Sequence, residues 1–68
     1  MIAITVNGEP RTCPAGLELR EVLLHLGYKP DVVVVELNGT IYSRSQGFER
    51  RVVESDALEV VTIVGGGT

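Results

Sequence analysis

The N-terminal residues alternate between apolar and polar or small side chains, which is the pattern of a strand with one buried face. Apolar residues stand at positions 2, 4 and 6, and Asn7-Gly8 follows them directly. This dipeptide favours a two-residue type I′ turn, because both of its residues must adopt a positive φ. We therefore predict a hairpin whose second strand covers Glu9–Cys13, with Pro10 favouring an edge position.

An apolar stripe with helical spacing follows the hairpin. Its members recur at i, i+3, i+4 and i+7, namely Leu19, Val22, Leu23 and Leu26. Two acidic residues, Glu18 and Glu21, lie near the predicted start, where they favour the helix dipole. Gly27 is placed to terminate the helix. These signals predict one α-helix over Leu17–Leu26.

The second half of the chain predicts three more strands separated by turn signals. A continuous β-branched run favours a central strand buried on both faces, and Asn38-Gly39 supplies a second tight turn. Before the last strand, Arg44–Arg51 is interpreted as a loop or single helical turn whose Phe48 enters the core. The three strands are predicted at Val32–Leu37, Thr40–Ser43 and Leu58–Val64.

This order of elements predicts an α+β fold, a β-grasp in which one α-helix packs across a mixed sheet of about five strands. The second and third strands are joined through the helix, which leaves the first and last strands free to pair in the centre. One domain is expected over residues 1–64, followed by a flexible C-terminal glycine tail over residues 65–68.

Composition narrows the function classes. A chain of 68 residues allows one domain and no roomy cavity beside its core. The net charge of −3 lacks the basic field typical of nucleic-acid binding, and no basic cluster suits an anionic membrane. No apolar stretch is long enough to span a bilayer, and the N-terminus lacks the basic segment of a signal peptide. We expect a cytoplasmic protein without nucleic-acid or membrane partners.

Side chains suited to catalysis are sparse. Cys13 and His25 would make a nucleophile pair only if they met, and a half-buried strand cysteine with an exposed helix histidine is the preferred interpretation. Glu54 and Asp56 are interpreted as part of a solvated turn before the last strand. No spacing of ligand residues resembles a metal site. The sequence therefore predicts a protein that is not an enzyme and has no metal or cofactor.

The last strand offers a candidate partner surface. Val61 and Ile63 share one face of this strand, and they are exposed if the opposite face forms the core. With Val34 or Tyr42 they would form an apolar patch for a partner. The alternative, that a neighbouring strand or Phe48 covers them, stays open at this point.

The strongest functional signal is the run Gly65-Gly66-Gly67 directly after an apolar strand. A frayed terminus usually has mixed polar composition, whereas glycines let a backbone thread a narrow channel and approach a reactive centre. Four extended residues reach about 13 Å, which is enough to place a terminal carboxylate inside another protein's active site. Ordering them costs about 1–2 kcal/mol per residue, which suits a partner that binds and releases.

The whole chain resembles the ThiS family of sulfur carriers in thiazole and thiamine biosynthesis, within the ubiquitin-like β-grasp group. The resemblance rests on the order of its segments: Ile4–Glu9, Leu19–Leu26, Glu36–Gly39, Ser43–Ser45 and Val60–Gly67. It implies that an E1-like adenylyltransferase activates the terminal glycine carboxylate with ATP. A sulfur donor then converts it to a thiocarboxylate, whose sulfur passes to thiazole synthase. On this sequence the adenylated residue is Gly67.

Two positions depart from the family pattern. Thr68 follows Gly67, so the carboxyl group that the chemistry needs is in a peptide bond. Removal of Thr68 by a peptidase, an artefactual residue and loss of carrier function are the three interpretations. Many relatives also have a glycine before the aspartate, where this chain has Ser55.

Two alternative functions stay open. The chain is either a sulfur carrier for another pathway, such as molybdopterin, cysteine or a secondary metabolite, or a β-grasp interaction module that carries no sulfur. The second alternative predicts that the sheet face around Val61 and Ile63 is essential and the glycine tail is not.

Overall fold

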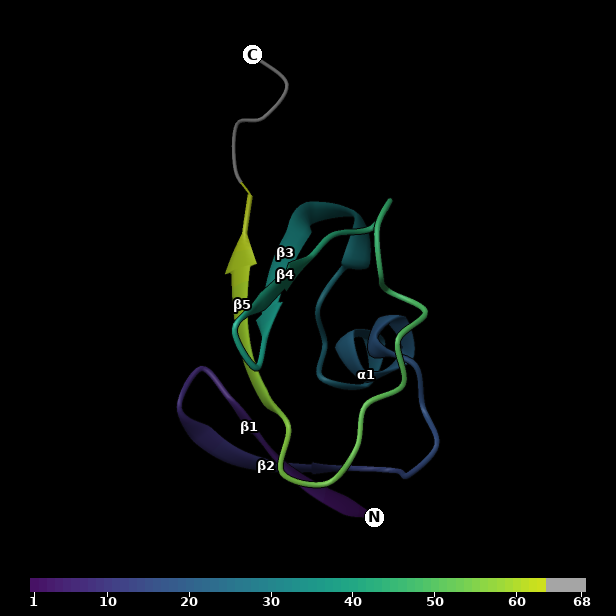
Figure 1. Cartoon of the computed structure of the whole chain (residues 1–68), viewed down its shortest axis with the longest axis vertical. Coiled ribbons are helices and arrows are strands. Elements are labelled where there is room, and N and C mark those ends of the chain that lie inside the picture. Colours follow the sequence, from purple (N-terminus) through teal and green to yellow (C-terminus); the bar gives the residue numbers. More distant parts are fainter. Residues whose placement is uncertain (64–68) are drawn as a thin grey trace.

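A five-stranded sheet with one α-helix across it forms the structure, a computed structural model that describes residues 1–63 (Figure 1). The strands stand in the order β2-β1-β5-β3-β4. Their bounds are β1 Ile2–Val6, β2 Glu9–Cys13, β3 Val33–Leu37, β4 Thr40–Tyr42 and β5 Ala57–Thr62. Helix α1 spans Leu19–His25, and the 3-10 helix η1 spans Pro30–Val32. This arrangement confirms the predicted α+β β-grasp fold.

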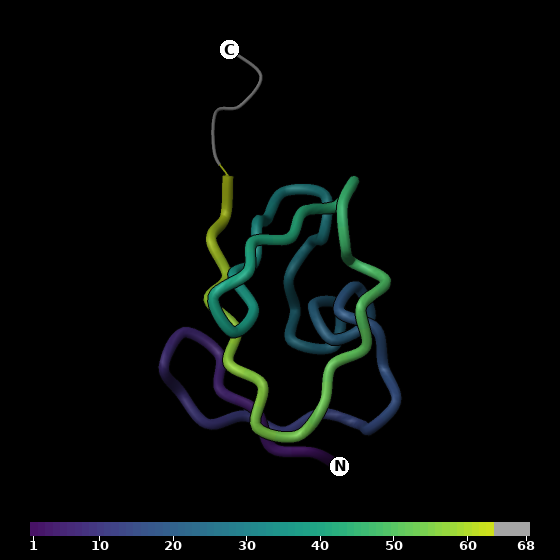
Figure 2. Tube along the Cα trace, viewed as in Figure 1, coloured from purple at the N-terminus to yellow at the C-terminus, as the bar shows by residue number. Residues whose placement is uncertain are grey.

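The first and last strands pair in the centre of the sheet, as predicted. β1 and β5 run parallel, with Thr5 opposite Ala57 and Val6 opposite Leu58. The other neighbouring pairs, β1–β2, β3–β4 and β3–β5, are antiparallel. Figure 2 shows the segment after β4 passing the helix and entering β5 near the N-terminal end of the molecule. Because β1 and β5 are parallel, β5 ends at the side of the sheet opposite Met1.

Both Asn-Gly dipeptides form the tight turns that the sequence predicts. Asn7 and Asn38 each have a φ of 51°, and the glycines after them have φ values of 82° and 89°. The Asn7 side chain also extends the central pairing, because its Oδ1 accepts the N–H of Val60 at 2.7 Å. Pro10 lies in the edge strand β2, as predicted.

Helix α1 is shorter than the predicted Leu17–Leu26. Leu17 stays outside the helix, because its carbonyl accepts the N–H of Val52 and ties this segment to the loop before β5. Gly27, with a φ of 93°, ends the helix in the left-handed conformation, as predicted. The sequence therefore predicted the C-terminal end of the helix closely. The helix begins later than predicted, at Leu19, because Leu17 is bonded to the loop.

The core lies between α1 and one face of the sheet. Phe48 enters it from the loop after β4 and is fully buried, as predicted. Cys13 is fully buried as well, so the prediction of a half-buried cysteine is wrong. The core side chains are Ile4, Val6, Cys13, Leu19, Val22, Leu23, Val33, Val35, Leu37, Phe48, Val52, Leu58 and Val60.

Strand β3 departs from its prediction. It begins at Val33, because Val32 belongs to η1. Burial alternates along it, with Val34 half-buried and Glu36 exposed, so the interpretation of a strand buried on both faces is wrong. The β-branched run reflects strand propensity, and α1 covers only one of its faces.

The last two strands lie close to their predicted ranges. β4 covers Thr40–Tyr42 instead of Thr40–Ser43, and β5 begins one residue earlier than predicted, at Ala57. The predicted end of β5 at Val64 lies outside the described residues, as does the predicted tail over residues 65–68. The single domain over residues 1–64 stays a prediction.

Asp56 is buried, so the prediction of a solvated turn is wrong for this residue. One carboxylate oxygen accepts the N–H of Val53 at 2.8 Å, and the other accepts a hydrogen bond from Nδ2 of Asn38 at 2.8 Å. Arg50 adds an ion pair, with its Nη1 3.4 Å from Oδ2 of Asp56. The side chain of Asp56 therefore joins the turn that precedes β5 to the β3–β4 turn.

Ser55 stands in the same turn with a φ of 71°. A left-handed conformation costs a residue with a Cβ about 1–2 kcal/mol. Glycine avoids that cost, which gives a physical reason for the glycine expected before the aspartate in the family pattern.

We expect Asp56→Ala to lower the free energy of unfolding by about 1–3 kcal/mol, because Val53 and Asn38 lose their hydrogen-bond acceptor. Urea unfolding followed by circular dichroism measures the change. The matched control is Glu49→Ala, which removes an exposed carboxylate and should change the free energy by about 0.5 kcal/mol or less. Equal losses in the two variants would contradict the structural role of Asp56.

Candidate partner-binding face of the sheet

The sheet has one face packed on α1 and an opposite face that no described element covers, which we call the open face (Figure 1). Paired residues of neighbouring strands point to the same side, so the register assigns each strand residue to one face. The open face carries Ala3, Thr5, Pro10, Thr12, Val34, Glu36, Ile41, Ala57, Glu59 and Val61. All of these are exposed except Val34, which is half-buried.

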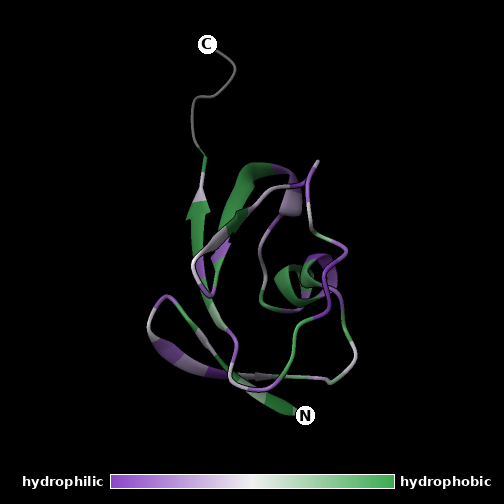
Figure 3. Ribbon diagram, viewed as in Figure 1, coloured by the Kyte–Doolittle hydropathy of each residue, from purple (hydrophilic) through white to green (hydrophobic). Residues whose placement is uncertain are grey.

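Hydrophobic residues occupy the end of β5 and the neighbouring strand β3 (Figure 3), and several of them are exposed. Val61 is 61% exposed and lies opposite Val34 of β3. Ile63, 50% exposed, continues this pairing, because its N–H donates to the Val32 carbonyl at 2.7 Å. These four residues and Ile41 of β4, which is 71% exposed, form what we call the apolar patch. Exposed apolar groups of this kind mark interaction sites in proteins.

The apolar patch contains both strand residues that the sequence singled out, Val61 and Ile63, together with the suggested neighbour Val34. The other suggested neighbour, Tyr42, is wrong, because it points to the helix side and packs against the core. The alternative in which Phe48 covers the patch is also wrong, since Phe48 is buried in the core. Partner binding by Val61 and Ile63 stays a prediction.

Sequence reasoning missed Ile41 and Val32. A strand of three residues is too short to show alternation, so Ile41 carried no signal of its own. The face of Ile41 could have been inferred from the Asn38-Gly39 turn, because a two-residue turn places Ile41 opposite Glu36. Val32 was missed because the run of valines concealed the start of the strand.

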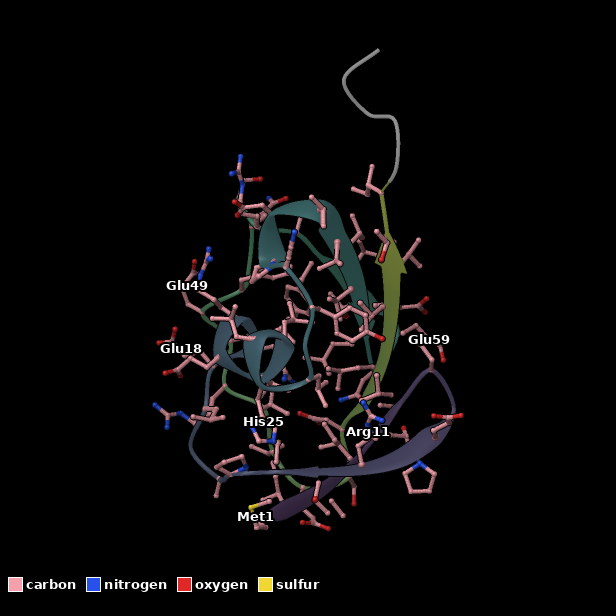
Figure 4. The ribbon with its side chains drawn as sticks, turned by 180° about the vertical axis from the view of Figure 1, so that it is seen from behind. Met1, Arg11, Glu18, His25, Glu49 and Glu59 are labelled. Carbon is pink, nitrogen blue, oxygen red and sulfur yellow. The ribbon has the colours of Figure 1, made fainter. Side chains whose placement is uncertain are left out.

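Two acidic residues, Glu36 and Glu59, lie directly opposite each other on β3 and β5 beside the apolar patch, and we call them the acidic pair. Both are exposed, and they are the only charged residues that the described strands place on the open face. Neither takes part in an ion pair within residues 1–63. Figure 4 shows Glu59 projecting from β5 away from α1. Like charges in this position weaken the pairing of the strands.

Cys13 and His25 do not form a catalytic pair. Burial raises the pKa of the Cys13 thiol above its ordinary value and removes the thiol from substrates. His25 is exposed, as predicted, at the end of α1. It lines an open hollow of about 520 Å³ with Ala3, Pro10, Arg11, Thr12 and Leu26, a set that holds no thiol and no carboxylate.

Within residues 1–63, no three histidine, cysteine or carboxylate side chains gather into a group that would hold a metal ion. Over the same residues, no helix has the length and apolar character needed to cross a membrane.

The predicted tail residues Gly65, Gly66 and Gly67 lie outside the described residues. In the sequence, only Val64 separates Ile63 of the apolar patch from Gly65. The apolar patch is therefore next to the start of the predicted tail along the chain.

Comparison with known proteins shows one family across nearly the whole chain. The model of the ThiS family matches residues 4–67. The structure is similar to the crystal structure of the thiamine biosynthesis protein ThiS from Geobacter metallireducens, with a TM-score of 0.76 and 35% sequence identity. That match covers 97% of this chain and 100% of the other.

Two further relatives differ in how much of their length this chain matches. A thiazole synthase of Magnetococcus marinus is 41% identical over 64 residues, which are 94% of this chain but 20% of that protein. The uncharacterized protein ycf40 of Porphyra purpurea is 33% identical over 66 residues, which are 97% of this chain and 93% of that protein. The chain thus spans about a fifth of this thiazole synthase and nearly all of ycf40.

Proposed function

The chain belongs to the ThiS family, and on that premise we propose that it is the sulfur carrier of thiazole formation in thiamine biosynthesis. The observation that carries the proposal is the family match over residues 4–67, which includes the three glycines of the tail. The similarity in fold and sequence to the ThiS protein of Geobacter metallireducens supports it.

In the proposed reaction, the chain supplies only one reacting group, the terminal carboxylate of Gly67. An E1-like adenylyltransferase joins this carboxylate to the adenylyl group of ATP and releases pyrophosphate. A sulfur donor then displaces AMP and leaves a thiocarboxylate, whose sulfur passes to thiazole synthase. The described residues are consistent with this, because Cys13 is buried and the hollow beside His25 holds no thiol and no carboxylate.

Thr68 sets a condition on this chemistry. It follows Gly67 in the sequence, so the carboxyl group of Gly67 is free only after Thr68 has been removed. We therefore include a peptidase among the proposed partners. We also propose that the reaction takes place in the cytoplasm.

The open face is proposed as the surface that holds the carrier on its partners while the tail enters their active sites. The apolar patch supplies buried area beside the tail, and desolvated apolar contacts carry much of the affinity in protein interfaces. The Magnetococcus thiazole synthase supports thiazole synthase as one partner, because a segment similar to this chain is part of that polypeptide.

The carrier role predicts a thiocarboxylate on the form of the chain that ends at Gly67. Incubation with a matching adenylyltransferase, ATP and a sulfide source should raise the intact mass by the difference between one sulfur and one oxygen atom. The full chain ending at Thr68 is the control and should keep its mass. An unchanged mass of the Gly67 form, with an enzyme that loads its own carrier in parallel, would refute the carrier role.

The partner role of the open face predicts that Val61→Asp weakens binding to thiazole synthase by at least about tenfold, because it places a charge in the centre of the apolar patch. The measurement is calorimetric titration of the synthase with each variant. Leu24→Asp is the matched control, since Leu24 is 58% exposed on α1, away from the open face. Equal affinities of the two variants would argue against this surface as the binding site. In a separate test, unchanged function after deletion of residues 66–68 would favour an interaction module that carries no sulfur.

A further inference from the structure

The acidic pair places two like charges side by side in the middle of a sheet face. Glu36 and Glu59 lie directly opposite each other, and their Cβ atoms are therefore only about 4.5–5.5 Å apart. The chain has six basic residues, yet none of them lies among the strand residues of the open face. The isolated carrier thus keeps two like charges together without a neighbouring cation on that face.

The surroundings of the acidic pair are uncharged. Ile41 flanks it on β4, opposite Glu36, and Val34 and Val61 lie two residues further along their strands toward the tail. Two residues of strand span about 7 Å. A partner that covers the apolar patch would therefore also remove water from the carboxylates, which is costly unless they are paired.

We infer that the surface of thiazole synthase that covers the open face is apolar beside the tail and carries a basic side chain, best an arginine, opposite the acidic pair. This inference rests on the proposed carrier function. A guanidinium presents several N–H donors in one plane and can bond two carboxylates at once. Its charge relieves the repulsion between Glu36 and Glu59. The acidic pair therefore lowers the folding stability of the free carrier and raises the affinity of the complex.

A second copy of this chain is a poorer occupant of the open face. It would bring an uncharged and acidic surface against the same uncharged and acidic surface, and no strand residue of the face would offer a cation to either carboxylate. Charge complementarity raises the rate of association and suppresses wrong partners. The acidic pair therefore sets which partner binds, and the apolar patch supplies area.

The test compares two double variants of the chain ending at Gly67. Glu36→Gln with Glu59→Gln removes the acidic pair, and Glu9→Gln with Glu49→Gln removes two other exposed carboxylates, so the net charge changes equally. Calorimetric titration of thiazole synthase gives the affinity at low and high salt. Urea unfolding shows whether each variant folds.

We expect the first variant to unfold at the same or higher urea concentration than the unmodified chain, and to bind at least about tenfold more weakly with a reduced salt dependence. The second variant should bind like the unmodified chain. Equal affinities and equal salt dependence of the two variants would overturn the inference. The carrier function would still stand after that result if the Gly67 form gains its thiocarboxylate. If the unmodified chain does not bind thiazole synthase at all, the inference is also overturned.

Discussion

The parallel pairing of the first and last strands is the constraint on which the rest of the structure depends. It brings residues more than fifty positions apart into register and places β5 in the centre of the sheet. Two side chains secure the pairing from outside the ladder: Asn7 accepts the N–H of Val60, and Asp56 fixes the turn that leads into β5. Both bonds are local substitutes for strand pairing where the strands end. Strand β5 is therefore paired with both β1 and β3, and Asn7 adds a further hydrogen bond at Val60.

One helix cannot cover two faces of a sheet, and the proposed function follows from this limit. Helix α1 and Phe48 close the core on one side of the sheet and leave the open face for the proposed partners. The open face is mostly uncharged, and its apolar patch is next to the tail along the chain. Such a surface suits a carrier that presents the same group to successive enzymes, since it provides docking area without a catalytic group of its own.

Much of the fold could be predicted from local signals. The Asn-Gly turns, the helical spacing of the leucines and Gly27 each act over a few residues, and each gave the correct element. The errors concern contacts between distant residues: Asp56 is buried because Asn38 and Arg50 reach it, and Tyr42 points to the core because of its register with β3. The acidic pair was equally hidden, because the residues that face each other belong to different strands. Burial on both faces of β3 was wrong since strand propensity alone cannot count the helices that cover a sheet.

The central claim is that the open face, and not the helix side, meets the enzymes that handle the tail. Backbone amide chemical shifts of the chain ending at Gly67, recorded during titration with thiazole synthase, test this claim most directly. The account predicts that the largest changes fall on β3, β4 and β5, around Val34, Ile41 and Val61, and that α1 changes little. Changes concentrated on α1 and on the hollow around His25 would contradict it.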